Sequence, residues 1–346
     1  MFWMRIKITV AVMLPLLLFG GCADNRELEQ DDVIRIAFIT ETFVIERWQR
    51  DRDIFVARAK ELGAEVLVKH TFEDSEDQIR VIEEMIRQDV DVIVVIPHDK
   101  DALTAVIRKA KDNGIGVIAY DRLIMNADID LYVSFDNFAV GSLMAQYLLR
   151  EVPSGKYVLI NGSPYDHNSF ILREGYMSVL NPYIESGDIE IIGEIWAEGW
   201  RAEKAYEFVN TLIADGNEIN AIVAANDLLA EGAIKALSEN RLAGIVTVSG
   251  QDTELAACQR IVEGTQHMSV YKPIGVLAKG AAEAAVMLAK GETPSANYTI
   301  DNGTYVIPYL KFQPVAVTRH NMMDTIIRDG FHLLEDVYRN IPSEHR

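Results

Sequence analysis

The chain has 346 residues, of which 49% are hydrophobic and 25% charged, and its formal net charge is −19. This length is enough for two domains with cores of their own, and the composition is that of an ordinary globular protein. A chain this acidic is a poor binder of nucleic acid or of anionic membrane surfaces, so we expect no nucleic-acid partner. A small neutral ligand or a protein partner is favoured instead.

The first 21 residues predict a signal peptide, because two cations precede an uncharged apolar run over 8–19 and two glycines then stand before Cys22. Cleavage before Cys22 resembles the processing of a bacterial lipoprotein, in which this cysteine is acylated, although Phe19 stands where that pattern usually has Leu. An uncleaved anchor is the alternative, but the run is short for a transmembrane helix. Both interpretations place the rest of the chain outside the cytoplasmic membrane, anchored to it or periplasmic.

Residues 22–32 are polar and acidic and predict a flexible tether behind the lipid anchor. The second cysteine, Cys258, lies in a segment with helical spacing. If Cys22 is acylated, no intrachain disulfide is available, and Cys258 is expected to be a buried, inert thiol.

From residue 33 onward, strand-like and helix-like periods alternate, which is typical of a parallel, doubly wound α/β sheet. The predicted strands of the first half are 33–39, 65–70, 91–97, 116–122 and 131–137, and the predicted helices are 52–63, 75–88 and 101–114. We expect Ser75 to cap the second of these helices.

The alternation then restarts, so a second half of similar size is expected. Its predicted strands are 156–161, 189–195, 221–225, 245–249 and 269–271, and its predicted helices are 138–151, 169–180, 201–214, 228–238 and 253–264. A long Ala-rich helix over 274–290, a strand over 304–310 and a tail over 324–339 that ends in an amphipathic helix complete the chain. No Gly/Ser linker separates the halves, so we expect them to touch.

Polar and aromatic side chains follow almost every predicted strand, where open α/β sheets place their ligands. These side chains are Glu46, Arg47, Trp48, Asp121, Arg122, Asp136, Asn137, Asp166, Asn168, Trp196, Trp200, Asn226, Asp227, Gln251, Asp252 and Lys272. If the two halves face each other, this strand-end set lines one cleft.

Several members of the set have a structural alternative. Helix capping is the alternative for Asn226 and Asp227, and the favoured role of Asp136 and Asn137. Trp48 and Trp200 are alternatively core aromatics. Lys272 is alternatively a solvated charge, but it follows a buried-looking strand and precedes a proline, which favours a functional role.

The chemistry of the strand-end set indicates a sugar ligand. Carboxylates, amides and cations bind hydroxyls, and the charged groups make the stronger hydrogen bonds, while an indole covers the flat C–H face of a pyranose. The sequence has no nucleophile–base motif, phosphate loop or zinc spacing, so we expect a binding protein rather than an enzyme, with no metal and no cofactor. A secreted carbohydrate-active enzyme is the alternative, because scattered carboxylates can in principle form a glycosidase pair.

Several motifs resemble those of the periplasmic D-xylose-binding proteins, which are sugar-binding proteins of ABC transporters. The motifs include ERWQ, AYDR, SPYDHN and VYKPI, and the resemblance extends over about residues 33–331. It implies the type I periplasmic-binding fold, with two doubly wound parallel-sheet lobes joined by a three-crossing hinge. The implied lobes are 33–138 plus 273–310 and 139–272 plus 311–340.

The resemblance also implies the ligand-binding residues and the partner. The implied ligand contacts are Arg47, Asp121, Arg122, Asp166, Asn168, Trp200, Asn226, Asp252 and Lys272, with Trp48 adjacent. The expected function is binding of D-xylose or a closely related monosaccharide and delivery of the sugar to an ABC permease. The alternative is a sensor subunit that signals to a membrane histidine kinase or chemoreceptor.

Overall fold

The computed structural model describes residues 33–41 and 46–342. The predicted signal peptide, the proposed lipidation site Cys22 and the tether lie outside the described residues. Within the two described ranges, no helix combines the length and apolarity needed to cross a membrane.

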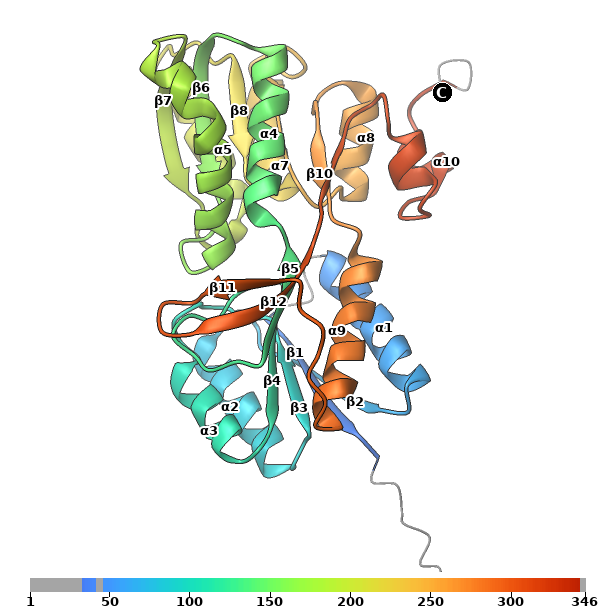
Figure 1. The fold of residues 1–346 in the computed structure, drawn as a ribbon. Helices are drawn as coiled ribbons and strands as arrows, with labels where there is room; N and C mark the ends of the chain where they lie inside the picture. Colours follow the sequence, from blue (N-terminus) through green and yellow to red (C-terminus); the bar gives the residue numbers. More distant parts are fainter. Residues whose placement is uncertain (1–32, 42–45, 343–346) are drawn as a thin grey trace, which may run out of the picture. The chain divides into compact units, whose positions relative to one another are not determined.

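The first sheet has seven strands in the order β11-β12-β5-β4-β3-β1-β2 (Figure 1). The strands are β1 (Arg35–Thr40), β2 (Glu65–His70), β3 (Val92–Val95), β4 (Gly116–Tyr120), β5 (Leu131–Phe135), β11 (Tyr298–Asp301) and β12 (Val306–Phe312). Neighbouring strands are parallel except for the antiparallel pair β11–β12. Every residue of β3 and β5 is buried, which explains why these segments are apolar without alternation.

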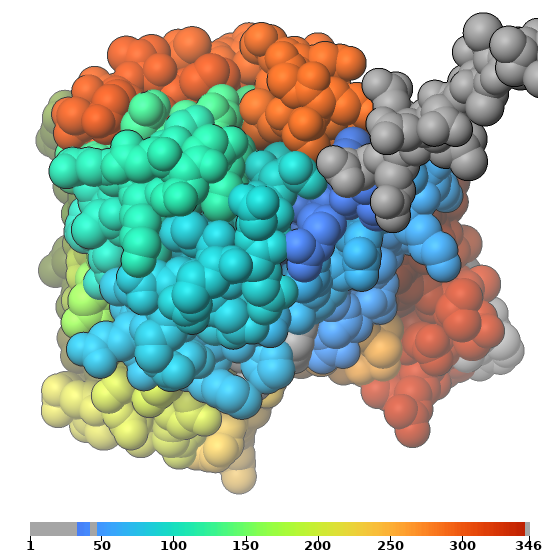
Figure 2. All heavy atoms as spheres, turned by 90° about the horizontal axis from the view of Figure 1, so that it is seen from below, coloured from blue at the N-terminus to red at the C-terminus, as the bar shows by residue number. Residues whose placement is uncertain are grey.

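Helices cover both faces of this sheet. They are α1 (Glu46–Glu61), α2 (Ser75–Arg87), α3 (Thr104–Asp112) and α9 (Ile274–Ala289). Side chains of β1 alternate between two cores, because Ile36 and Phe38 pack with α1 and α9, whereas Ala37 and Ile39 pack with α2 and α3. Viewed from below, the blue-to-teal segments and the orange end of α9 form a continuous surface (Figure 2).

The second sheet has four parallel strands in the order β7-β6-β8-β9. They are β6 (Gly155–Asn161), β7 (Ile189–Trp196), β8 (Ala221–Ala224) and β9 (Thr247–Val248). The accompanying helices are α4 (Asn137–Glu151), α5 (His167–Glu185), α6 (Ala202–Ala214), α7 (Asp227–Glu239) and α8 (Leu255–Glu263), with a 3₁₀ turn over Glu198–Trp200. A short antiparallel pair, β10 (Ser269–Tyr271) with β13 (Val315–Val317), lies beside this part of the molecule.

The chain passes three times between the two sheets (Figure 1). It leaves the seven-stranded sheet between β5 and α4, returns between β10 and α9, and leaves again between β12 and β13. We call the seven-stranded sheet with its helices the first lobe, and the four-stranded sheet with α4 to α8 the second lobe. The two doubly wound parallel sheets and the three crossings agree with the expected fold class, while the residue boundaries of the lobes stay predictions.

The structure differs from the sequence-based expectations at several element ends. Helix α1 starts at Glu46 rather than at 52, so Arg47 and Trp48 lie in its first turn. Asp74, not Ser75, caps α2, because its side chain accepts hydrogen bonds from two backbone N–H groups of the first turn. Strands β11 and β13 were not expected from the pattern.

The amphipathic helix expected at the end of the 324–339 tail is present only as a short helix. A π-helical turn spans Met323–Ile327 and a short helix, α10, spans only Leu334–Val337. Gly330 lies between them with a φ of 66°, a left-handed conformation that ends a helix.

Candidate functional site

One cavity lies where the carboxyl ends of strands from both lobes meet. It is lined by all ten residues expected from the sequence, namely Arg47, Trp48, Asp121, Arg122, Asp166, Asn168, Trp200, Asn226, Asp252 and Lys272, and by Asn137 and Gln251. Parallel sheets place the loops after their strands at one edge, so residues far apart in the chain converge there.

Arg47 and Asp121 form the centre of the first-lobe side. Arg47 Nη2 lies 2.8 Å from Asp121 Oδ2, and its guanidinium also faces Asp51 at 3.4 Å. Tyr120, the last residue of β4, donates its hydroxyl to Asp51. Burial opposes the charge of Asp121, but Arg47, Lys272 and Arg122 outweigh it and lower the pKa of this carboxyl below its ordinary value. Asp121 is therefore a charged hydrogen-bond acceptor at neutral pH.

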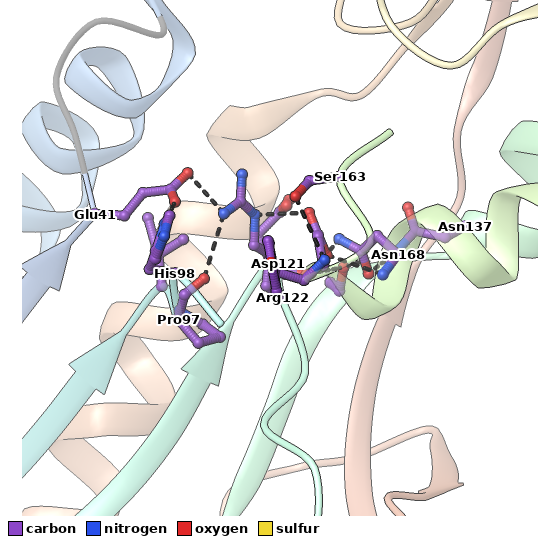
Figure 3. A network of polar contacts seen from close by, with 12 residues as sticks. Glu41, Pro97, His98, Asp121, Arg122, Asn137, Ser163 and Asn168 are labelled. Carbon is purple, nitrogen blue, oxygen red and sulfur yellow. Dashed lines mark hydrogen bonds and ion pairs between the residues drawn. The ribbon is translucent and has the colours of Figure 1, made fainter. Parts of the chain in front are cut away.

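Arg122 is held between the two lobes (Figure 3). Its Nη1 lies 2.6 Å from Glu41 Oε1 and 3.3 Å from the carbonyl oxygen of Pro97, while its Nε lies 2.8 Å from Asp166 Oδ2. Glu41 in turn pairs with His98 at 3.0 Å.

The start of α5 supplies Asp166 and Asn168. Asp166 caps the helix through its side chain, which accepts from the N–H of Asn168 at 2.9 Å. Asn168 reaches the first lobe, because its Nδ2 donates to the carbonyl of Asp121 at 3.0 Å and its Oδ1 accepts from Tyr132 at 3.2 Å. Asn137 Nδ2 donates to the same oxygen at 2.9 Å. These hydrogen bonds fix the orientation of the Asn168 amide.

Asn226, Asp252 and Lys272 complete the polar lining. Asn226 caps α7 with its side-chain oxygen, which accepts from Leu229 N–H at 2.9 Å, so its amide nitrogen is left for other contacts. Lys272 Nζ lies 2.7 Å from Asp252 Oδ1, and Arg47 Nη1 lies 3.6 Å from the same oxygen. Asp252 thus faces a cation from α1 and a cation from the crossing after β10.

Two buried tryptophans supply apolar surface. The Arg47 guanidinium carbon stands 4.3 Å from the centroid of the Trp48 ring. The Trp200 ring lies directly on the backbone of Gly162, where an added Cβ would come within 2.1–2.4 Å of three ring atoms. Both tryptophans also belong to the cores of their lobes, so the alternative of core aromatics and the expected site role both apply.

Four buried polar atoms of the lining make no hydrogen bond within the described part of the chain. They are the indole nitrogens of Trp48 and Trp200, which are donors, and Oε1 of Gln251 and Oδ1 of Asp252, which are acceptors. Of these, only Asp252 Oδ1 has ion-pair contacts, to Lys272 and Arg47. Buried polar groups are rarely left unpaired in native proteins. Donors and acceptors distributed in this way around a cavity with aromatic walls suit a polyhydroxylated ligand.

Sequence reasoning left three participants unassigned. Asn137 was expected to be a helix cap, but the cap of α4 is Asp136, and Asn137 lines the cavity. Gln251 belonged to the strand-end set and was not assigned to the site, although its place beside Asp252 is a usable signal. Glu41 directly follows β1 and pairs with Arg122, and the same strand-end rule finds it. Over the described ranges no cluster of three or more His, Cys, Asp or Glu that could hold a metal ion is present.

Comparison with known proteins identifies the class. Residues 36–293 match the model of the periplasmic binding protein domain family. The chain is 46% identical to the D-xylose-binding periplasmic protein of Haemophilus influenzae, over 97% of this chain and 100% of that protein. It is also 46% identical to the protein of that name from Escherichia coli, over 95% and 98% of the two chains.

A solved structure gives the same classification. The chain is similar, with a TM-score of 0.82 and 28% identity, to an ABC transporter solute-binding protein from Clostridium phytofermentans with bound β-D-glucose, over 88% of this chain and 99% of that one. The protein belongs to the periplasmic binding protein domain family and has the type I fold of its sugar-binding members. It is a binding protein of this family and not an enzyme.

Proposed function

We propose that this protein binds D-xylose between its two lobes outside the cytoplasmic membrane and delivers the sugar to an ABC permease. The observation that carries the proposal is one cavity lined by all ten expected residues, in which three buried polar atoms have no partner within residues 33–41 and 46–342. The 46% identity to two D-xylose-binding periplasmic proteins supports xylose as the sugar.

Each part of the lining has a role in this proposal. Asp121, Asp166 and Asp252 accept hydrogen bonds from sugar hydroxyls, while Arg47, Arg122, Asn168, Asn226 and Lys272 donate to hydroxyl or ring oxygens. Trp48 and Trp200 cover the apolar faces of the ring. Since the contacts come from both lobes, a ligand that bridges them stabilises the state in which the full set is assembled.

The affinity follows from the size of the ligand. A pentose has about ten heavy atoms, and about 0.8–0.9 kcal/mol per atom, within the small-ligand ceiling, gives a dissociation constant of about 1 μM or somewhat below. An analogue that lacks a bonded hydroxyl leaves buried partners unpaired and is rejected strongly. D-glucose is rejected by exclusion of its additional CH₂OH group.

Calorimetric titration with D-xylose, D-ribose, L-arabinose and D-glucose tests the ligand. Tight binding of D-xylose alone is the expected result, and a folded protein without affinity for D-xylose contradicts the proposal.

The substitution Asp121→Ala tests the site. It removes a charged acceptor, whose hydrogen bonds contribute roughly 1.5–3 kcal/mol, so the dissociation constant for D-xylose should rise more than tenfold while the protein stays folded. The matched control is Asp128→Ala, an exposed aspartate in the following loop, which should leave the affinity unchanged. If Asp121→Ala leaves the affinity for D-xylose unchanged, the site assignment is wrong.

The partner and the anchor complete the proposal. Delivery to a permease predicts permease and ATPase genes beside this one, whereas a neighbouring kinase and response regulator would favour the sensor function. We propose acylation of Cys22 as the membrane anchor, which mass spectrometry of the protein extracted from membranes checks directly.

A further inference from the structure

Asp227 is a buried carboxylate next to the proposed site that does not line the cavity. It is the first residue of α7, it follows Asn226, and its side chain is inaccessible to solvent. Its oxygens accept from Ser269 Oγ at 2.9 Å, from Gln266 Nε2 at 2.7 Å and from the backbone N–H of Glu254 at 3.1 Å. Asp227 therefore connects the start of α7 to β10, to the turn before β10 and to the start of α8.

The segment between β9 and α8, residues 250–254, carries Gln251 and Asp252 in an unusual conformation. Asp252 and Thr253 have φ values of 90° and 52°, in the left-handed region that residues other than glycine rarely adopt. Such strain persists only where the surrounding structure holds the backbone in place. We call this segment the Asp252 loop.

The hydrogen bonds of Asp227 enclose the strained residues. Ser269 Oγ, which donates to Asp227, accepts from the N–H of Thr253 at 3.1 Å, and the next N–H, that of Glu254, donates to Asp227 directly. On the other side, the N–H of Asp227 donates to the carbonyl of Gln251 at 3.1 Å. The loop is thus tied to Asp227 before and after Asp252.

Gly250 makes this approach possible. A Cβ at residue 250 would stand 2.1 Å from Asp227 Oδ1 and 2.6 Å from Gln266 Nε2, so a side chain there is incompatible with the carboxylate in its place. The loop backbone and the Asp227 side chain are fitted to each other.

We infer that Asp227 is a positioning residue for sugar binding, which holds the Asp252 loop in the conformation that presents Gln251 and Asp252 to the ligand. The inference rests on the proposed function of the cavity. It assigns to Asp227 a contribution to affinity without contact with the sugar.

The charge of Asp227 gives this role a pH dependence. Burial raises its pKa to about 7, with Asp252 acting in the same direction and Arg260 opposing it. Arg260 also faces Glu231 and Gln266, and donates to the backbone carbonyl of Asp227. The ionised Asp227 carboxylate accepts hydrogen bonds from Ser269, Gln266 and the N–H of Glu254 at the same time. The protonated carboxyl group instead points its own hydrogen at one of these three donors. Affinity for the sugar should therefore increase as the pH rises through about 7.

Stability has the opposite dependence on this group. Because the folded protein holds the Asp227 proton more tightly than the unfolded chain, with its ordinary pKa of 3.8, the stabilisation is complete below about pH 4. It is lost as the pH rises through about 7. If Asp227 served only the stability of the fold, the affinity for the sugar should not increase over the pH range in which the stability falls.

The test is Asp227→Asn in calorimetric titrations with D-xylose between pH 6 and 8.5. The amide has to place an NH₂ group against Gln266 Nε2 or the N–H of Glu254, so we expect at least a tenfold weaker affinity at pH 8 and loss of the pH step near 7. Leu180→Ala is the control, because it opens a cavity in the core of the same lobe, at the distant end of α5, and should lower the melting temperature without changing affinity. Unchanged affinity of Asp227→Asn, or a retained pH step, overturns the inference.

Two further measurements keep the inference falsifiable. If Asp227→Asn does not fold, Ser269→Ala is the substitute, because it removes the hydroxyl between Asp227 and Thr253. This variant should bind D-xylose at least threefold more weakly, and unchanged affinity overturns the inference.

If the unaltered protein does not bind D-xylose, the proposed function fails. The inference is then tested by amide hydrogen exchange without ligand. Asp227→Asn should accelerate exchange at Thr253 and Glu254 at least tenfold relative to Leu180→Ala, and equal rates overturn it.

Discussion

At the scale of single residues, several residues of the proposed site have backbone conformations that the sequence pattern does not predict. Asp121, Trp200 and Asp252 all have left-handed backbones, with φ values of 61°, 56° and 90°. Residues other than glycine pay a free-energy cost there, and such outliers cluster at binding sites. The strain turns each side chain out of the continuing strand or turn and toward the cavity.

The contact between Gly162 and Trp200 leads to a prediction. Gly162→Ala should displace the indole, because the new methyl group would overlap three ring atoms, and D-xylose should bind about tenfold more weakly or worse. Calorimetric titration measures the change. Gly275→Ala is the matched control, since a Cβ there meets nothing within 4 Å, and its affinity should be unaltered. If Gly162→Ala and Gly275→Ala bind D-xylose with equal affinity, Trp200 is not part of the binding surface.

At the scale of elements, helix N-termini bring the polar groups to the cavity. Arg47 lies in the first turn of α1, Asp166 caps α5, and Asn226 caps α7. Capping and ligand binding were alternatives for Asn226 when only the sequence was considered. The structure combines capping with a place in the cavity wall, because the side-chain oxygen serves the helix and the amide nitrogen remains.

Asn226→Ser separates the two roles. Serine is as good a cap as asparagine, so the melting temperature should stay near that of the unaltered protein. The lost amide donor should weaken D-xylose binding by about tenfold, as expected for one or two buried hydrogen bonds. Asp74→Ser, a cap exchange at α2 away from the cavity, should change neither quantity. If Asn226→Ser keeps the full affinity for D-xylose, Asn226 caps α7 but does not bind the ligand.

At the scale of the whole molecule, ion pairs join the lobes around the cavity. Arg122 contacts Asp166 and Arg47 faces Asp252, each pair combining a first-lobe cation with a second-lobe carboxylate. A ligand that satisfies groups of both lobes is bound by the folded protein alone. Its binding free energy therefore adds to the stability of the whole fold.

Thermal unfolding with and without sugar measures this linkage. D-xylose at a thousandfold excess over its dissociation constant should add about 4 kcal/mol to the free energy of unfolding and raise the melting temperature. D-ribose and L-arabinose at the same concentration should have a much smaller effect, and Asp121→Ala should reduce the xylose effect by about 1.5–3 kcal/mol. An identical shift with all three sugars would contradict selective recognition of D-xylose.

Much of the fold and of the cavity lining could be predicted from the sequence. Apolar runs such as 117–119 mark strands buried on both faces, and polar residues directly after such strands mark the ligand edge of a parallel sheet. Both are local signals, carried by neighbouring residues. For that reason Asp121, Arg122 and Asp252 could be assigned to one cleft without knowledge of the contacts.

Only the tertiary structure decided what depends on groups far apart in the chain. The pairing of Arg122 with Glu41 and Asp166, the place of Asn137 in the cavity and the left-handed backbone at Trp200 leave no periodic trace in the sequence. The tail forms only a short helix at its end for the same reason, since its segments pack on α8 and β10. Periodicity records which face of an element is buried, whereas a binding site depends on which elements meet.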